Sequence, residues 1–138
     1  MARIYFEILG EPVPKARHRT ARLPNGRMIA YQDKKARAQE DSFVAQAIQY
    51  APPSPLDGPL ALSVRAYSAI PQSWSQKKRQ AAMDGEIRPT KKPDADNLLK
   101  FVGDALNGIF WADDKQITTA SISKYFSDRP RWELEILH

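Results

Sequence analysis

The sequence predicts a single-domain α/β protein, residues 1–138, in which helices pack on a mixed β-sheet. A chain of 138 residues has the length of one domain. Its hydrophobic content of 42% and charged content of 27% are typical of a folded protein. Segments with the two-residue alternation of strands also occur among segments with helical periodicity, and this mixture favours a layered α/β fold.

Strands are expected where apolar and polar residues alternate. Residues 3–9 alternate around Ile4, Phe6 and Ile8. The same pattern predicts strands over residues 60–69, 116–127 and 131–137, and a short strand over residues 28–31. Between the first strand and the short one, residues 15–27 are expected to form a basic loop with a turn at Pro24-Asn-Gly26.

Three helices are expected. The first runs from an Asp33 cap to about residue 50, with an apolar stripe of Ala36, Phe43, Val44, Ala47 and Ile48. The second begins near residue 73 and exposes Lys77, Lys78 and Arg79. The third begins at Asp94 or Asp96 and ends at Asn107-Gly108. Its apolar face is formed by Leu98, Val102, Ala105, Leu106 and Ile109, whereas Asp96, Lys100 and Asp104 share the opposite face.

Composition narrows the function classes. The chain has no cysteine, which excludes disulfides, zinc–thiolate sites and thiol nucleophiles. No apolar run is long enough to span a membrane, and the N-terminus does not resemble a signal peptide. These features predict a cytoplasmic protein.

Basic residues are concentrated in two segments. Residues 1–37 contain nine Lys or Arg against three acids, a net charge of +6, and residues 77–92 contain six against two, a net of +4. Clustered bases indicate phosphate-backbone binding, although a basic surface without a nucleic-acid partner has the same charge. The candidate DNA-binding residues are Lys15, Arg17, His18, Arg19, Arg22, Arg27, Lys77, Lys78, Arg79, Lys91 and Lys92.

Between these basic segments and the last strands, the sign of the charge reverses. Residues 93–114 contain five acids and one base, a net charge of −4; the acids are Asp94, Asp96, Asp104, Asp113 and Asp114. Helix caps and solvated surface acids are one interpretation of this cluster. A calcium-binding loop is a second, but Leu99 stands where that loop needs glycine and Ala105 where it needs an acid.

A magnesium site for phosphodiester hydrolysis is the third interpretation. Mg²⁺ binds a few carboxylates and retains water, and it polarises a phosphate and generates hydroxide. Lys100, one turn after Asp96, is placed to neutralise charge that develops on the phosphate. A protein that only bound DNA would gain nothing from acids beside its basic surface, so the charge reversal favours an enzyme.

The acidic segment resembles the RusA-type Holliday-junction resolvases. The residues that carry the resemblance are Lys92-Pro-Asp-Ala-Asp-Asn-Leu-Leu-Lys100, Gly-Asp-Ala-Leu-Asn-Gly108 and Phe-Trp-Ala-Asp-Asp-Lys-Gln-Ile117. The similarity extends more loosely to the Pro-x-Ser-Trp-Ser segment near residue 73 and to the N-terminal strand and loop. It implies a RusA-like fold and a homodimeric, Mg²⁺-dependent endonuclease of phage or bacterial origin. It also implies that Mn²⁺ can take the place of Mg²⁺.

The resemblance also implies roles for individual residues. Asp94, Asp96 and Asp114 would bind the metal, with Asp113 as a further candidate, and Lys100 would be the essential basic residue of the catalytic site. Asp104 and Asn97 would support the site, Asp104 through an ion pair with Lys100. The expected activity is paired, symmetric cleavage of four-way junctions in DNA recombination and repair. The alternatives are a nuclease for other branched DNA and a non-catalytic branched-DNA-binding module.

Overall fold

The computed structural model describes residues 2–14, 19–31 and 34–138 of the chain. The elements, in order, are β1 (Arg3–Leu9), β2 (Arg19–Arg22), β3 (Met28–Tyr31), α1 (Lys34–Ala47), the 3-10 helix η1 (Ile48–Tyr50), β4 (Leu60–Ala69), α2 (Gln76–Met83), α3 (Ala95–Leu106), the 3-10 helix η2 (Asp114–Gln116), β5 (Ile117–Ser127) and β6 (Arg131–Leu137). The predicted α/β fold with a mixed sheet is confirmed.

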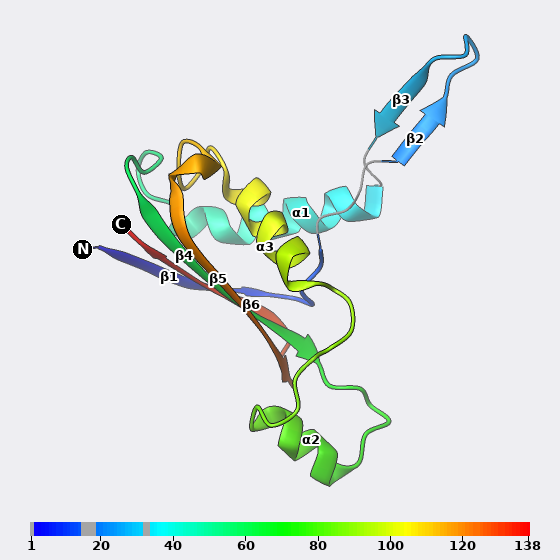
Figure 1. Ribbon diagram of the computed structural model, residues 1–138, viewed down its shortest axis with the longest axis vertical. Helices are drawn as coiled ribbons and strands as arrows, with labels where there is room; N and C mark the ends of the chain where they lie inside the picture. The colour runs from blue at the N-terminus through cyan, green and yellow to red at the C-terminus, as the bar shows by residue number, and fades with distance from the viewer. Residues whose placement is uncertain (1, 15–18, 32–33) are drawn as a thin grey trace.

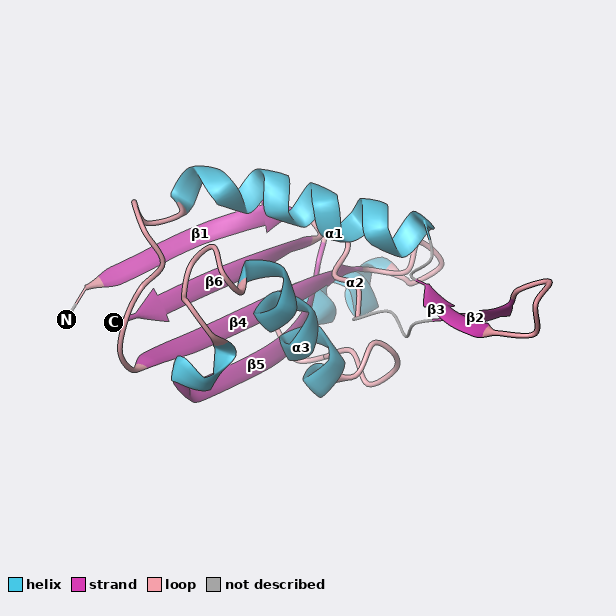
Figure 2. Cartoon of the chain, turned by 90° about the horizontal axis from the view of Figure 1, so that it is seen from above, coloured by secondary structure: helices cyan, strands magenta, loops and turns pink. Residues whose placement is uncertain are grey.

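The main sheet has four strands in the order β1-β6-β4-β5. β4 and β5 are parallel, and the other neighbours are antiparallel. A parallel pair needs a long crossover connection, and here that connection contains α2 and α3. Helices α1 and α3 lie on the same face of the sheet, α1 near β1 and α3 near β5 (Figures 1 and 2).

The core lies between this face of the sheet and the two helices. Alternate residues of β4, from Leu60 to Ala66, are at most 2% exposed, as the alternating sequence predicts. The rings of Phe43 on α1, Phe101 on α3 and Trp132 on β6 lie 5.2–5.5 Å from one another. Aromatic contacts of this kind fix α3 on the sheet, and α3 carries most of the predicted site.

The opposite face of the sheet is polar and carries a network around Glu133, which is 8% exposed. The carboxylate accepts hydrogen bonds from Arg131 at 2.9 Å, from Arg65 at 3.0 Å and from the Tyr67 hydroxyl at 3.3 Å. Burial disfavours the charged carboxylate, but Arg131 and then Arg65 outweigh that cost and lower the pKa of Glu133. Burial and the Glu133 charge together raise the pKa of Tyr67.

Strands β2 and β3 form a separate hairpin that projects from the body (Figure 1). The short strand at 28–31 was predicted, but residues 19–22 were expected within a loop, and that prediction is wrong. Arg22 pairs with Met28, and the turn closes through the N–H of Leu23, which donates to the carbonyl of Arg27 at 2.7 Å. Four residues rich in arginine have no strand pattern of their own, so their strand conformation comes from pairing with β3.

The two N-terminal helices differ from prediction at their ends. The predicted Asp33 cap lies outside the described residues. Ile48 was expected in the apolar stripe of α1, but it lies in the 3-10 helix and is 57% exposed, because the tighter winding rotates it off the stripe. α2 begins at Gln76 rather than near 73, since the hydroxyl of Ser75 caps it by accepting from the N–H of Lys78 at 3.2 Å.

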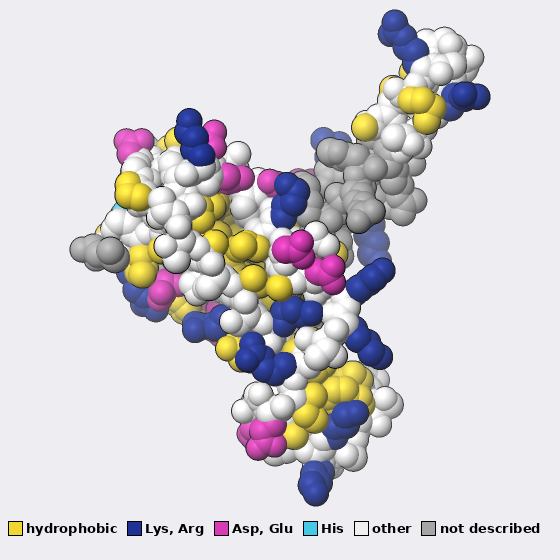
Figure 3. Space-filling view, viewed as in Figure 1, with side chains coloured by type: hydrophobic (Ala, Val, Ile, Leu, Met, Phe, Trp, Pro, Cys, Tyr) yellow, Lys and Arg dark blue, Asp and Glu magenta, His cyan; other side chains and the backbone are white. Residues whose placement is uncertain are grey.

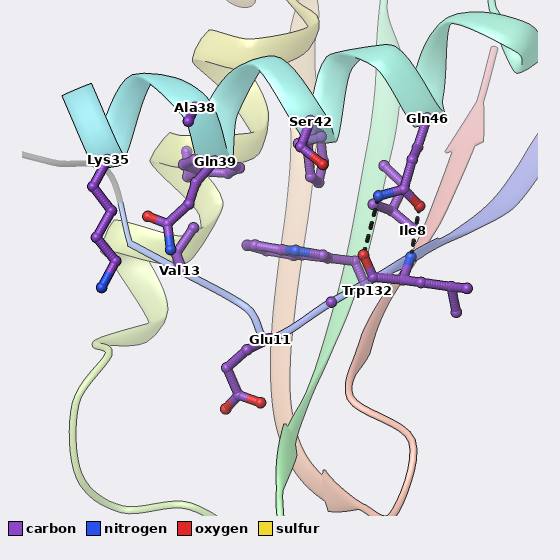
Figure 4. A pocket seen from close by; sticks show the side chains of 13 residues that line it. Ile8, Glu11, Val13, Lys35, Ala38, Gln39, Ser42, Gln46 and Trp132 are labelled. Carbon is purple, nitrogen blue, oxygen red and sulfur yellow. Dashed lines mark hydrogen bonds between the residues drawn. The ribbon is translucent and has the colours of Figure 1, made fainter. Parts of the chain in front are cut away.

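At the last residue of β1, Leu9, the free edge of the strand is hydrogen-bonded by a side chain from α1. The amide of Gln46 donates to the carbonyl of Leu9 at 3.1 Å and accepts from its N–H at 3.0 Å (Figure 4). Beside this pair, a cavity of about 350 Å³ lies between α1 and the end of β1, with Trp132 in its wall. Across the part of the chain that the structure describes, no helix is long and apolar enough to cross a membrane.

Candidate active site

The first turn of α3 carries two of the predicted metal-binding acids. Asp94 is the N-cap residue, with an extended backbone, and Asp96 lies in the first helical turn with its side chain exposed. Within the described residues, the side chain of Asp94 makes no capping hydrogen bond. Acids at a helix N-terminus are favoured by the helix dipole, which suits both positions.

The polar face of α3 continues to Lys100 and Asp104. The ammonium of Lys100 lies 3.7 Å from Oδ2 of Asp104, which confirms the predicted i, i+4 ion pair. The Lys100 side chain is 64% exposed, so the pair is solvated and leaves the ammonium accessible to an anionic ligand. Asn97, the other predicted supporting residue, is half-buried beside this face.

Asp114 returns to α3 from the far end of the helix. Its Oδ1 accepts a hydrogen bond from Nε1 of Trp111 at 2.7 Å. Its carboxylate also lies against Gly103, because a Cβ added to that glycine would be 3.8 Å from Oδ2. Gly103 and Asp96 are seven residues apart, which places them on the same face of the helix. Asp114 therefore faces the side of α3 that carries Asp96 and Lys100.

The adjacent Asp113 has a different environment. Its Oδ1 accepts from the N–H of Lys115 at 3.0 Å, and its own N–H donates to Oε1 of Gln116 at 2.8 Å, a capping box that starts η2. Nε2 of Gln116 in turn donates to the carbonyl of Leu56 at 2.7 Å. The 3-10 helix that Asp113 starts is therefore anchored by Gln116 to the loop before β4.

The sequence analysis did not identify two residues that are important for the geometry of the site. Trp111 is fully buried and orients Asp114, and Gly103 leaves room for the carboxylate beside α3. Two features of the sequence could have indicated them. A tryptophan stands three residues before an acid, and a glycine stands in the middle of a helix, where glycine costs about 1 kcal/mol relative to alanine.

The acids are gathered along α3 but do not form a compact cluster. Among residues 2–14, 19–31 and 34–138, no three acid or histidine side chains are close enough together to hold one metal ion. The helix rises about 10 Å between Asp96 and Gly103, which explains the separation of Asp96 from Asp114. Oxygen donors from one or two carboxylates, with water and substrate phosphate completing the shell, are nevertheless what Mg²⁺ ordinarily takes.

The predicted DNA-binding residues divide into three groups. Lys15, Arg17 and His18 lie outside the described residues, and the backbone of Arg19 belongs to β2. Arg22 and Arg27 are exposed on the projecting hairpin, and Lys77, Lys78, Lys91 and Lys92 are exposed on α2 and the segment before α3. Arg79 was predicted on the exposed face of α2. It is half-buried instead, because its guanidinium donates to the carbonyl of Pro71 at 3.0 Å.

Figure 3 shows how these charges are arranged on one face of the molecule. Acidic side chains lie near the middle of the face, with Lys and Arg on several sides of them. A hydrophobic area, bordered by further Lys and Arg, covers the lobe formed by α2. An anionic polymer laid across this face would meet basic groups on either side of the acids.

The chain is similar to a known protein family and to one known protein. The family model of endodeoxyribonuclease RusA matches residues 10–137. The chain is also 36% identical over 135 residues to the uncharacterized protein YqaN of Bacillus subtilis (strain 168), an alignment that covers 96% of this chain and 94% of that protein.

Proposed function

Because the chain belongs to the RusA endodeoxyribonuclease family, we propose that it is a Mg²⁺-dependent nuclease that resolves Holliday junctions. It would cut two opposed strands of a four-way junction symmetrically, in DNA recombination and repair. The observation that carries the proposal is the placement of Asp96, Lys100 and the Trp111-oriented Asp114 on one side of α3, between basic surfaces.

Asp94, Asp96 and Asp114 are the candidate metal ligands; because no three acids of the described residues meet, one or two of these carboxylates would hold the ion, and water and the substrate phosphate would complete its shell. All three offer hard oxygen donors, which suit Mg²⁺ and also Mn²⁺. When bound, the metal polarises the scissile phosphate and supplies hydroxide near neutral pH. The Trp111 indole holds one oxygen of Asp114 and so fixes the direction of the carboxylate, the role that outer hydrogen-bond partners play at metal sites. Asp113 is assigned to the η2 cap, since its carboxylate is already used there.

Lys100 would stabilise negative charge on the phosphate as the strand is cut. Its exposed ammonium is held at 3.7 Å from Asp104, and a solvated ion pair of this kind costs little to exchange for a phosphate contact. Asp104 would keep Lys100 oriented in the absence of DNA. Asn97, directly after Asp96, would support the metal-binding turn.

DNA would be held by the basic groups around the acids. The hairpin residues Arg22 and Arg27 extend from one side, and Lys77, Lys78, Lys91 and Lys92 lie on the other, with Lys15, Arg17, His18 and Arg19 also assigned to DNA. Arg79 is assigned a structural role because it is bonded to Pro71. Because many of these contacts would be to phosphates, the affinity for DNA would fall steeply as the salt concentration rises.

A homodimer would give the two symmetric active sites that paired cleavage needs. The edge of β5 supports this part of the proposal. Residues 118–121 of that strand are exposed, and residues 117–123 contain no charged residue or proline, the usual means of blocking an edge. Two copies of β5 paired antiparallel would form a continuous, twofold symmetric sheet. Light scattering on the purified protein gives the number of copies.

The deciding experiment compares a synthetic four-way junction with linear duplex of the same sequence, each with and without Mg²⁺. Paired symmetric nicks in the junction alone, dependent on Mg²⁺, are the expected result. Cleavage of flaps in preference to junctions would assign the protein to other branched DNA. Junction binding without cleavage in either Mg²⁺ or Mn²⁺ would make it a non-catalytic binding module. The proposed activity would take place in the cytoplasm of a bacterium. The gene would belong to the bacterial host or to a phage.

A further inference from the structure

A groove of about 560 Å³ lies between α2 and the segment 87–93. Its lining includes the apolar residues Trp74, Ile87 and Phe126 and the basic residues Lys78 and Lys91. The groove continues to Lys92 and Pro93, immediately before the N-cap residue of α3. None of the acids of the proposed metal site lines the groove, but Pro93, which does, directly precedes Asp94 in the chain.

The groove is held in shape by several fixed contacts. The Trp74 ring meets Phe126 edge-on at 5.1 Å. The Arg88 guanidinium lies 4.1 Å from the ring centre of Tyr125, and its Nε donates to the carbonyl of Lys124 at 2.8 Å. The ammonium of Lys124 donates to the carbonyl of Lys91 at 2.8 Å. The wall formed by residues 88–91 is therefore tied to β5, so the groove exists before a ligand enters.

The chemistry of the lining indicates a ligand with an apolar and an anionic part. The aromatic and aliphatic residues of the lining favour a flat, stackable group, whereas its lysines favour phosphate. Lys78 lies next to the aromatic part of the lining, with its ammonium 4.1 Å from the ring centre of Trp74. The volume of the groove lies in the range of small-ligand sites.

The presence of Glu11 in the lining favours a nucleotide over a simple anion as the ligand. Glu11 is one of the lining residues, and its carboxylate accepts from the N–H of Ala69 at 3.0 Å. A site for phosphate alone would be weakened by a carboxylate in its lining. A base bound in the groove instead offers ring and amino N–H groups that a carboxylate accepts.

We propose that this groove holds one unpaired nucleotide of the DNA strand, with its base on Trp74, Ile87 and Phe126 and its phosphate at Lys78 and Lys91. The position of that nucleotide next to the phosphate that is cut rests on the proposed nuclease function. A proline-rich peptide is a different occupant that aromatic grooves take. The lysines of the lining and its last residue before α3, Pro93, which directly precedes Asp94, favour the nucleotide.

Tryptophan fluorescence can test this occupant at a single residue. The chain has three tryptophans. Trp111 and Trp132 are 0% and 2% exposed, whereas Trp74 is half-buried in the groove. A base that stacks in the groove therefore quenches the emission of Trp74 and leaves that of the other two unchanged.

The experiment titrates the full-length Asp96→Asn protein, without divalent metal, with a single-stranded oligonucleotide, the matching duplex and a proline-rich peptide. Saturable quenching by the single strand, weak quenching by the duplex and none by the peptide are expected. Trp74→Phe, which retains an aromatic floor, should remove the quenching. Circular dichroism and a thermal melt of each variant establish that it is folded.

Lys78→Ala and Lys77→Ala form a matched pair, because both remove one positive charge from α2 but only Lys78 lines the groove. Lys78→Ala should weaken single-strand binding about five- to tenfold more than Lys77→Ala. Equal effects of the two variants, binding by anisotropy without quenching, or quenching by the peptide in place of DNA would each overturn the proposal. The quenching readout needs neither metal nor cleavage. If the unsubstituted protein cut no junction in Mg²⁺ while the quenching was retained, the nuclease function would be contradicted and the groove assignment would stand.

Discussion

Nε1 of Trp111 donates a 2.7 Å hydrogen bond to Oδ1 of Asp114, and this contact distinguishes two adjacent aspartates. The indole is fully buried, so the carboxylate it holds is fixed relative to the core. Asp113, one residue earlier, uses its carboxylate to cap η2. Of the two acids, Asp114 is therefore the one oriented toward α3.

Trp111→Phe should lower cleavage about tenfold or more and raise the Mg²⁺ concentration needed for half-maximal rate. Phenylalanine keeps most of the buried ring but removes the N–H, so Asp114 loses its orientation, as when an outer partner of a metal ligand is removed. Cleavage rates measured over a Mg²⁺ series report this change. Asp113→Asn is the control, since it should alter stability at η2 with little change in the Mg²⁺ requirement. The reverse ranking of the two variants would assign the metal to Asp113.

Gly103→Ala should keep cleavage and raise the free energy of unfolding by about 1 kcal/mol, because alanine is favoured over glycine in a helix. The added Cβ would meet Oδ2 of Asp114 at 3.8 Å, an ordinary contact distance. Gly103→Leu would place a larger side chain where the carboxylate lies, and cleavage should fall sharply. Chemical denaturation and junction cleavage are measured on both variants. Full activity in Gly103→Leu would show that Asp114 is not needed beside α3.

Asp96→Asn should abolish cleavage in Mg²⁺ and leave junction affinity unchanged or slightly increased. The substitution removes a metal-binding oxygen charge and also removes repulsion between that carboxylate and the DNA phosphates. Gel-shift and cleavage assays separate the two effects. Asp57→Asn makes the same charge change at an exposed position in the loop before β4 and should affect neither. Lost binding with retained cleavage would contradict the assignment of Asp96.

Lys100→Ala should reduce turnover about a hundredfold while junction affinity changes less than about twofold, because its charge is needed mainly where negative charge develops in the transition state. Single-turnover rates and dissociation constants on the same junction give both quantities. Lys115→Ala, which removes an exposed lysine from η2, is the matched control. A loss of affinity equal to the loss of rate would make Lys100 a DNA-binding residue only.

Glu133→Gln should destabilise the fold by about 2 kcal/mol at neutral pH and flatten its response to acid. The folded-state pKa of Glu133 is lowered from its ordinary value of 4.5. Its ionised form therefore stabilises the native state above that value, and the contribution is lost as the pH falls through the lowered pKa. Thermal melts between pH 7 and pH 3 measure this. Glu135→Gln, which removes the more exposed Arg3 pair, should change stability less, and an equal change would contradict a special role for Glu133.

The sequence by itself determined the elements with strong periodicity and the chemistry of the acidic segment. The alternation in residues 60–69 and the apolar face of residues 98–106 each need a buried side, so pattern alone predicts β4 and α3. The Asp96–Lys100–Asp104 face follows from helical spacing, and the 3.7 Å ion pair confirms it. These features are local, because they depend on residues within a few turns of one another.

Tertiary structure decided what depends on residues that meet from different elements. Residues 19–22 are a strand only because β3 pairs with them. Arg79 is less exposed than its helical position predicts, and the carbonyl of Pro71 accepts its hydrogen bond. Asp114 rather than Asp113 faces α3 because the buried indole of Trp111 lies within hydrogen-bonding distance and Gly103 leaves space beside it. Adjacent residues in a turn point in different directions, and which of them reaches a helix is set by the packing of the core.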